Sequence, residues 1–506
     1  MTSSIEKRYF FTIIITILRA LISFITGILI ARFLGQSVFG NMSFLLGTFI
    51  AFKQLLDMGS SQAFFTFMSK EFRSKIFVVT FFSWLIFQLV SVSIVIGFIL
   101  SSKWVEIIWH QDNKILIIFA FIAAFLQNSV WPSMQQALEA QRKTYIGQII
   151  SISTVIVHLI AITLLCFFQY LGLITIFIAV LIEYSIAIFI SYRYLDFNLD
   201  RETDEKYKIE LRQIAKMYIN FCSPIIIYSV ISFLYSFIDT WLLQKFGGSQ
   251  KQAIYAVSNQ FSSIALLATS AISNIFFKEI TEAFHNNDLI KVGIVYSRVY
   301  RFLFVIAALI SCFLIPWTKN ILQYLLGDSY TAGYLTLSIM LLYPIHQSIG
   351  QIGGSVLFAV EHVALQVKIG IIFMILSMFV TYFVLAPTNA IIPGLNLGSE
   401  GLALKMLLMQ FLQVNIIIYF ISNILNLKFD YALQFIVIIT LLIISYITFF
   451  SINYFQLFSN SFLISIIFGF ILYLFLVFII LFYKPRLLGI NKLEIVNFFN
   501  KLSFKF

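Results

Sequence analysis

The sequence predicts an all-α integral membrane protein that crosses the bilayer about fourteen times. The chain has 506 residues, of which 60% are hydrophobic and only 11% are charged, and it contains 58 phenylalanines. A soluble domain of that length and composition would aggregate. Apolar runs of about twenty residues or more recur between short polar connectors, which is the length that spans a bilayer as a helix. The runs lack the strict alternation of barrel strands, and a helix satisfies its own backbone polar groups in hydrocarbon.

The apolar runs define the expected spans in chain order. Six precede a long polar stretch, at 10–32, 42–68, 76–100, 115–136, 145–168 and 171–192. Six follow it, at 218–243, 253–277, 292–317, 332–360, 367–386 and 402–424, and two more lie at 431–450 and 462–483. The first run carries Arg19, is too long for a signal peptide and lacks a small-residue cleavage site. We therefore expect it to remain a membrane helix.

The polar stretch DFNLDRETDEKYKIELR, at 196–212, divides the chain into two groups of six spans. The connectors RFLGQSVFGNMS, at 32–43, and QKFGGSQKQAIYAVS, at 244–258, resemble each other weakly and follow the first span of each group. Two lobes with the same topology are a common transporter plan, with the substrate path between them. We predict an N-terminal lobe at 1–195, a cytoplasmic linker at 196–216, a C-terminal lobe at 217–427 and two further helices with a tail at 428–506.

The net charge of +11 is explained by topology. If the amino terminus lies inside, most of the 33 Lys and Arg residues fall in cytoplasmic segments, as the positive-inside rule requires. No basic stripe with interleaved aromatic residues indicates nucleic-acid binding, so membrane lipid is the expected partner of this charge. Cys166, Cys222 and Cys312 all fall within predicted spans and are expected to be core residues rather than a disulfide framework or metal site.

Charged residues inside the predicted spans are the first candidate site residues. Arg19, Lys53, Asp57 and Glu183 fall near the middle of their spans, where each charge costs about 2.5 kcal/mol or more unless it faces water or a partner. Lys53 and Asp57 are four residues apart, so they form either a structural pair or a cavity cation tuned by a carboxylate. Arg19 has no partner in its own helix. It either binds an anion such as a diphosphate, or pairs across helices with Asp57 or Glu183.

Polar residues also line one side of the predicted span 253–277. They recur at spacings of three and four, so they form one helix face, which either binds sugars along the path or makes interhelical hydrogen bonds. These residues are Ser258, Asn259, Ser262, Ser263, Thr269, Ser270, Ser273 and Asn274.

Three further positions stand out in other spans. Gln347 and His346 lie near the middle of 332–360, and a lone histidine there is more often structural than a proton carrier. Asp239 lies near the outer end of 218–243, where partial hydration makes an acid less costly.

Three segments resemble a known family: ARFLGQSVFGNMSFLLGTFIAFKQLLDMGSSQAFF (31–65), QALEAQRKTYIGQII (136–150) and IDTWLLQKFGGSQKQAIYAVSNQF (238–261). They are similar to the bacterial O-antigen and capsule polysaccharide flippases of the multidrug/oligosaccharidyl-lipid/polysaccharide exporter superfamily. Gln36 stands where the family often has proline. The matching residues are Ala31, Arg32, Leu34, Gly35, Phe39, Gly40, Leu56, Asp57, Gly59 and Asp239.

The resemblance implies a MATE-like fold of two six-helix lobes plus two C-terminal helices. It also implies a rocking carrier that moves undecaprenyl-diphosphate-linked oligosaccharide to the outer leaflet of the bacterial cytoplasmic (inner) membrane, with both termini cytoplasmic. A polysaccharide polymerase and a chain-length regulator are expected partners. No cofactor is expected apart from a coupling proton or sodium ion.

Together these observations predict a flippase for surface polysaccharide, including the O-antigen of lipopolysaccharide, and no enzyme. The alternatives are a multidrug/cation antiporter of the same superfamily and a membrane-embedded polysaccharide polymerase. Two cations inside the membrane suit an anionic substrate better than a cationic drug, and the sequence has no donor-binding domain or metal motif of a polymerase. The hypothesis assigns substrate binding to Arg19, Lys53, Ser258, Asn259, Ser262, Asn274 and Gln347. It assigns the coupling ion to Asp57, Glu183 and Asp239, with no catalytic or metal-binding residue.

Overall fold

The computed structural model describes residues 2–70, 75–196, 211–455 and 461–483, but not the side chains of residues 2–10, 211, 265 and 267–275. All regular structure in these residues is helical. The chain forms two compact units, each described here by itself. Unit 1 comprises Met1–Ala253 and Met374–Gly398, and unit 2 comprises Ile254–Phe373 and Ser399–Phe506. The predicted lobe boundaries stay a prediction; most of the predicted linker and the predicted tail after 483 lie outside the described residues.

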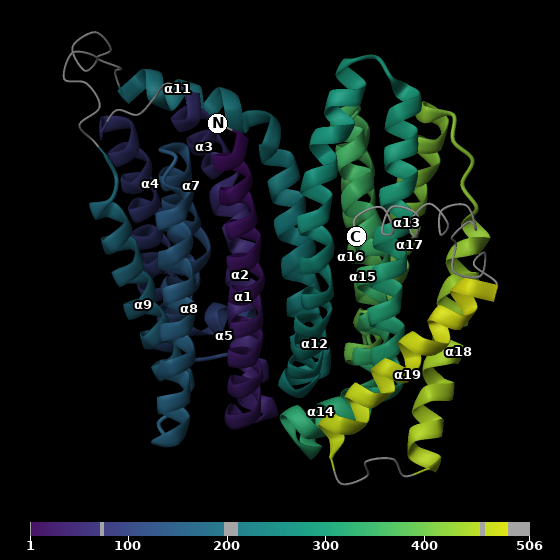
Figure 1. Cartoon of the computed structure of the whole chain (residues 1–506). Coiled ribbons are helices and arrows are strands. Elements are labelled where there is room, and N and C mark those ends of the chain that lie inside the picture. Colours follow the sequence, from purple (N-terminus) through teal and green to yellow (C-terminus); the bar gives the residue numbers. More distant parts are fainter. Residues whose placement is uncertain (1, 71–74, 197–210, 456–460, 484–506) are drawn as a thin grey trace. The chain divides into compact units, whose positions relative to one another are not determined.

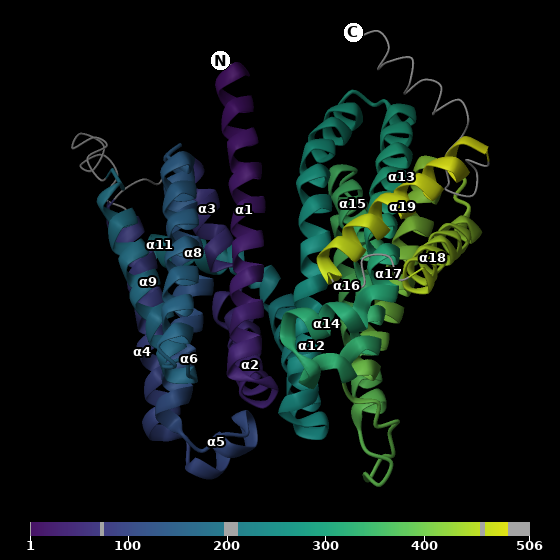
Figure 2. The ribbon, with the colours of Figure 1, turned by 60° about the horizontal axis from the view of Figure 1, so that its bottom comes forward.

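Unit 1 contains the predicted spans of the first half of the chain (Figure 1). Two pairs of helices distant in sequence pack together, α1 with α8 and α2 with α6, and the consecutive helices α8 and α9 also pack against each other. Figures 1 and 2 both show α8 and α9 side by side. The elements are α1 (Thr2–Leu34), α2 (Gln36–Asp57), α3 (Ser60–Lys70), α4 (Lys75–Ile94), η1 (Val95–Ile99), α5 (Ser102–Trp109), α6 (Lys114–Phe125), η2 (Leu126–Val130), α7 (Trp131–Ala140), α8 (Thr144–Phe167), α9 (Leu173–Arg193), α11 (Leu211–Cys222), η3 (Ser223–Ile225) and the first part of α12 (Ile226–His285).

Unit 2 contains the rest of α12 and is built around α13 and α15, which pack against each other along their lengths. The C-terminal helix α19 packs on α18, and α18 packs on α13. The elements are α13 (Leu289–Leu314), η4 (Ile315–Trp317), α14 (Thr318–Leu326), η5 (Asp328–Gly333), α15 (Tyr334–Ala359), the first part of α16 (Val363–Leu385), α17 (Gly398–Leu425), α18 (Tyr431–Tyr454) and α19 (Phe462–Tyr483).

The predicted fold class is confirmed. The described residues contain 12 helices long and apolar enough to cross a membrane. One of them, Arg212–Ile264, has 53 residues and runs through Gly248, whose backbone is not helical, so it holds more than one crossing. The helix α15, which contains Pro344, is long enough to cross but falls outside the 12. The protein is therefore a multi-pass membrane protein with about fourteen crossings.

Two predicted spans are broken in the structure. The span predicted at 42–68 ends as α2 at Asp57, because Met58 (φ 42°) and Gly59 (φ 86°) adopt left-handed backbone before α3 begins. The span predicted at 218–243 starts inside α11, and the turn at Ser223–Ile225, which contains Pro224, separates α11 from α12. In Figure 1, α11 runs across the ends of neighbouring helices of its unit rather than along them. The short helices α5 and α14 were not predicted.

Within unit 1, the start of the second connector (244–253) lies against the first connector. Ser37, at the start of α2, lies 3.0 Å from Ser249 through their hydroxyl oxygens, and Gln244 donates a hydrogen bond to Asn41 at 3.1 Å. No other residue fits at Gly40, because a Cβ atom added there would lie 1.8 Å from the backbone carbonyl oxygen of Ser249. Gly40 is therefore required by a close approach of two backbones.

Candidate functional site

A polar cluster inside unit 1 contains Arg19. Its Nη1 donates a hydrogen bond to the hydroxyl of Ser151 on α8 at 2.7 Å, and the residue is half-buried. Tyr184 on α9 is close enough to Arg19 to interact electrostatically, and its hydroxyl accepts a hydrogen bond from Gln127 at 3.2 Å. Gln127 lies in the π-helical segment η2, a distortion that is frequent at functional sites.

Glu183 lies beside this cluster and pairs with a residue that the sequence analysis missed. Its Oε2 lies 2.8 Å from Nδ1 of His158 on α8, and only 7% of Glu183 is exposed. Its second oxygen, Oε1, has no hydrogen-bond partner among the described residues. The predicted cross-helix pair of Arg19 with Asp57 or Glu183 is not found among the described residues: Arg19 bonds Ser151, and Glu183 bonds His158.

Asp57 caps α3. It accepts hydrogen bonds from the backbone N–H of Ser61 at 2.9 Å, from the hydroxyl of Ser60 at 3.2 Å and from the hydroxyl of Ser61. Among the described residues no ion pair joins Lys53 to Asp57, so the expected contact between them is absent. Both residues lie in the last turn of α2, not mid-span, because the helix ends at Asp57.

This geometry predicts that Lys53 and Asp57 contribute independently to stability. Asp57→Ala removes the cap of α3 and should cost about 1 kcal/mol, whereas Asp57→Ser keeps a capping oxygen and should cost little. Lys53→Met combined with Asp57→Ala should show a coupling energy below about 0.5 kcal/mol, since the two groups share no contact. Thermal unfolding of the purified variants measures both the stability lost in each single variant and the coupling energy of the double variant. A coupling energy of about 2 kcal/mol would instead indicate an ion pair.

Asp239 lies in a buried oxygen-rich site within unit 1. The hydroxyl of Thr381 on α16 donates to its Oδ1 at 2.6 Å, and only 8% of Asp239 is exposed. The hydroxyl of Ser377, one helical turn before Thr381, is also buried and has no partner among the described residues. The expected partial hydration of this acid is not found, since Asp239 is buried.

The polar face of α12 falls in unit 2 and is partly occupied by structural hydrogen bonds. Ser258 donates to the carbonyl of Ile254 at 2.8 Å, and Ser262 donates to the carbonyl of Met340 on α15; both serines are 1% exposed. The bond of Ser262 matches the interhelical alternative, whereas that of Ser258 lies within α12 itself. Asn259 is exposed, Gln347 is half-buried, and the side chain of Asn274 lies outside those described.

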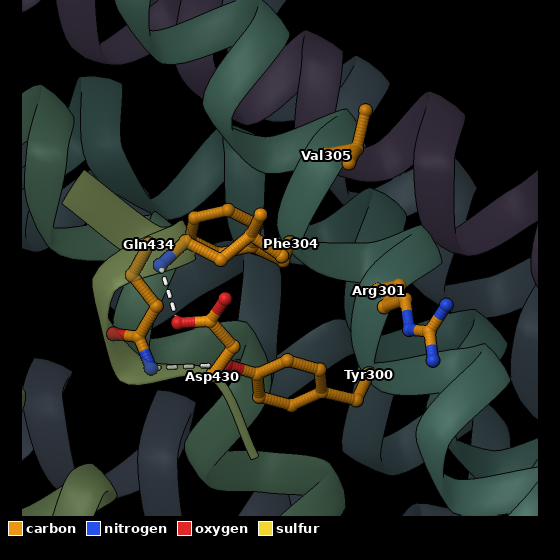
Figure 3. Close-up of a pocket in the computed structure, with 7 residues that line it drawn as sticks. Tyr300, Arg301, Phe304, Val305, Asp430 and Gln434 are labelled. Atoms are coloured by element: carbon orange, nitrogen blue, oxygen red, sulfur yellow. Dashed lines mark hydrogen bonds between the residues drawn. The ribbon is translucent and has the colours of Figure 1, made fainter. Parts of the chain in front are cut away.

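A second polar cluster lies in the core of unit 2. Gln434 on α18 donates to the hydroxyl of Tyr300 at 3.0 Å and to Oδ1 of Asn415 at 3.1 Å. Figure 3 shows Gln434 and Tyr300 facing each other beside a cavity of about 10 Å³, room for roughly one water molecule. His346 is buried against the ring of Phe411, and neither of its ring nitrogens has a hydrogen-bond partner among the described residues.

Lys405 is a buried cation near the start of α17. The residue lies within α17, and its side chain is 1% exposed. The helix starts at Gly398, four residues before the predicted span, because the polar sequence Ser399–Glu400 forms its first turn.

Comparison with known proteins extends these observations. Residues 5–277 match the family model described as polysaccharide biosynthesis protein. No curated protein matches the chain in sequence.

Several solved structures share the fold. A structure of the lipid II flippase MurJ in an inward closed conformation is similar over 94% of this chain and 99% of its own, with a TM-score of 0.69 and 15% identity. An inward-facing multidrug resistance MATE family transporter of the MOP superfamily covers 81% of this chain and 95% of its own, with a TM-score of 0.64 and 12% identity. A MOP superfamily transporter from Pyrococcus furiosus is similar over 83% of this chain and 95% of its own, with a TM-score of 0.58 and 11% identity.

Proposed function

Because the chain belongs to the polysaccharide biosynthesis protein family, we propose that it is a flippase for undecaprenyl-diphosphate-linked oligosaccharide repeat units. It acts in the bacterial cytoplasmic membrane, by alternating access, in the synthesis of a surface polysaccharide such as O-antigen, capsule or exopolysaccharide. The observation that carries this proposal is Arg19, a guanidinium held inside an apolar unit without an acidic partner among the described residues. The shared fold with a lipid II flippase supports it.

The chemistry of Arg19 suits a diphosphate. The guanidinium has five N–H donors, and Ser151 accepts one bond, so donors remain for the oxygens of an anion. A phosphate at about 4 Å from the guanidinium gains about 4 kcal/mol at an effective dielectric constant near 20. Lys53, which is half-buried and forms no ion pair among the described residues, adds a second cation in unit 1. The polar groups Asn259, Asn274 and Gln347 are proposed contacts for sugar.

Two acidic groups are proposed for coupling to a proton or sodium ion. One carboxylate oxygen of Glu183 contacts His158, and the other has no hydrogen-bond partner among the described residues. A proton bound to this second oxygen would change the charge of the pair. Asp239 with Thr381 and Ser377 offers oxygen ligands suited to a hard cation. Asp57, which caps α3, remains a third proposed coupling residue.

The second candidate function is a multidrug/cation antiporter, because MATE family transporters share the fold. The two functions differ in the charge of the cargo, and Arg19 and Lys53 favour an anion. Cells from which the gene has been deleted should regain surface polysaccharide when the gene is reintroduced. The same cells should show no ethidium efflux that depends on the protein. Ethidium efflux without restored polysaccharide would establish the antiporter. We propose no catalytic role, and a polysaccharide polymerase and a chain-length regulator are the proposed partners downstream.

The proposed topology, with both termini cytoplasmic, predicts which loops react with an impermeant thiol reagent. In a variant whose Cys166, Cys222 and Cys312 are replaced by serine, Gln250→Cys should label in intact cells, because this exposed residue lies on the proposed outer side. Arg142→Cys, on the proposed inner side and also exposed, should label only after permeabilisation. The opposite pattern would invert the topology.

A further inference from the structure

A pocket of about 550 Å³ lies in unit 2 where α13 begins and α17 ends. Its apolar wall is formed by Leu289, Ile290 and Ile294 of α13 and by the last residues of α17. Its polar wall contains Ser297, Arg298, Arg301 and Asn426. No acidic side chain lines it, although Asp288 caps the adjacent end of α13 through the backbone N–H of Lys291 at 2.9 Å.

Arg298 lies on the exposed side of α13. The opposite side of this helix packs into the core, where Val292, Val295 and Val299 are buried. At spacings of four residues from Arg298, Ile290, Ile294 and Phe302 are 79%, 53% and 51% exposed, so they form a stripe that faces hydrocarbon. Arg298 is exposed within that stripe and has no ion pair among the described residues.

Arg301 supplies the second cation from the next turn of α13. Figure 3 shows its guanidinium directed away from Tyr300, Gln434 and Asp430. The carboxylate of Asp430 is used at the start of α18, where it accepts hydrogen bonds from the backbone N–H groups of Ala432 at 3.1 Å and Leu433 at 3.3 Å. Arg301 lines the pocket beside Arg298.

We propose that this pocket binds the phosphate headgroup of an anionic phospholipid, such as phosphatidylglycerol. Arg298 and Arg301 line a pocket at the end of α17 (Gly398–Leu425). The ends of membrane-spanning helices lie where headgroup phosphates lie, and guanidinium groups bind phosphate through several donors. The exposed isoleucines of α13 accommodate the first part of the acyl chains. The hydroxyl of Ser297 and the side chain of Asn426 can hydrogen-bond the glycerol headgroup. In the proposed topology this end of unit 2 faces the inner leaflet.

The occupant is a bulk lipid rather than the transported molecule, because Arg298 belongs to an exposed stripe of α13 and a bulk anionic lipid is present in large excess over any transported lipid. The proposal concerns this lipid-exposed face and does not depend on what the protein transports.

Native mass spectrometry of the purified full-length protein tests the site. The protein is incubated with equimolar phosphatidylglycerol and phosphatidylcholine, and the wild type should retain phosphatidylglycerol preferentially. Arg298→Ala should weaken this retention about fivefold, and the double variant Arg298→Ala/Arg301→Gln about 30-fold, since each cation near an anionic lipid contributes roughly equally. Arg298 is exposed, so its replacement leaves the core intact. If the double variant folds poorly, the single variant Arg298→Ala is sufficient for the test.

The matched control is Lys291→Ala, an exposed cation on the same helix that does not line the pocket. It should leave the preference nearly unchanged; a loss as large as that of Arg298→Ala would show diffuse attraction and overturn the site. Equal retention of both lipids by the wild type would also overturn it. Excess inorganic phosphate should not displace the lipid. Displacement by undecaprenyl diphosphate that requires Arg298 would assign the pocket to that lipid and overturn the phospholipid assignment.

Discussion

Replacing Arg19 by alanine is expected to reduce export of surface polysaccharide at least about 100-fold while leaving the amount of folded protein nearly normal. Loss of a cation about 4 Å from a phosphate removes about 4 kcal/mol of attraction, which corresponds to roughly three orders of magnitude in affinity. Arg19 makes one hydrogen bond, to Ser151, among the described residues, so the fold loses little. Surface polysaccharide is measured by gel electrophoresis of cell extracts, with protein abundance measured in the same membranes.

Two further variants separate the charge from the hydrogen bond. Arg19→Lys should restore export only in part, because lysine keeps the charge but loses the planar donor geometry. Ser151→Ala removes the partner of Arg19 and leaves the guanidinium in place, so export should stay within a few fold of wild type. Normal export by Arg19→Ala would show that Arg19 is structural, and the diphosphate assignment would fail.

Gly40→Ala is expected to abolish accumulation of folded protein. The added Cβ would lie 1.8 Å from the carbonyl oxygen and 2.6 Å from the carbonyl carbon of Ser249, and both are backbone atoms that cannot rotate away. The two segments must therefore separate, which also strains the hydrogen bond between Gln244 and Asn41. Overpacking of a tight site typically costs 1–3 kcal/mol, and a clash with backbone this close is expected to exceed about 3 kcal/mol. Size-exclusion chromatography of a fluorescent fusion measures the folded yield.

Gly147→Ala is the matched control for that substitution. Gly147 is also a buried helical glycine, but its Cβ would lie 3.6 Å from a Leu138 methyl carbon, an ordinary contact. Alanine is the better helix former, so this variant should fold as well as wild type. A normal yield for Gly40→Ala would show that α2 and α12 do not approach as closely as described.

The membrane-spanning layout was predictable from hydropathy because each crossing needs one long apolar run. The spans at 145–168 and 171–192 match α8 and α9 within two residues at each end. The break after Asp57 was not predicted, since Leu56 to Gly59 reads as part of an apolar run although Gly59 allows a left-handed turn there. Pro224 likewise indicates a helix break before the start of α12, but the predicted span 218–243 ran through it.

The candidate site could be predicted only as single residues. Charges inside spans identified Arg19 and Glu183 because an ionisable group in hydrocarbon is costly. Their partners Ser151 and His158 lie on another helix, and helix periodicity alone does not specify which faces of α1, α8 and α9 meet. The same limit explains why Lys53 and Asp57 were expected to touch: spacing along one helix permits a contact, but the cap of α3 uses the carboxylate instead.

The most direct test is translocation of a fluorescent undecaprenyl-diphosphate-linked oligosaccharide by purified protein in liposomes. Lipid that reaches the outer leaflet is detected by a membrane-impermeant quencher. The wild type should expose the labelled lipid well above the rate of protein-free liposomes, Arg19→Ala should fall to that background, and ethidium should not be transported by either protein. Ethidium transport by the wild type, with labelled lipid remaining at background, would contradict the account.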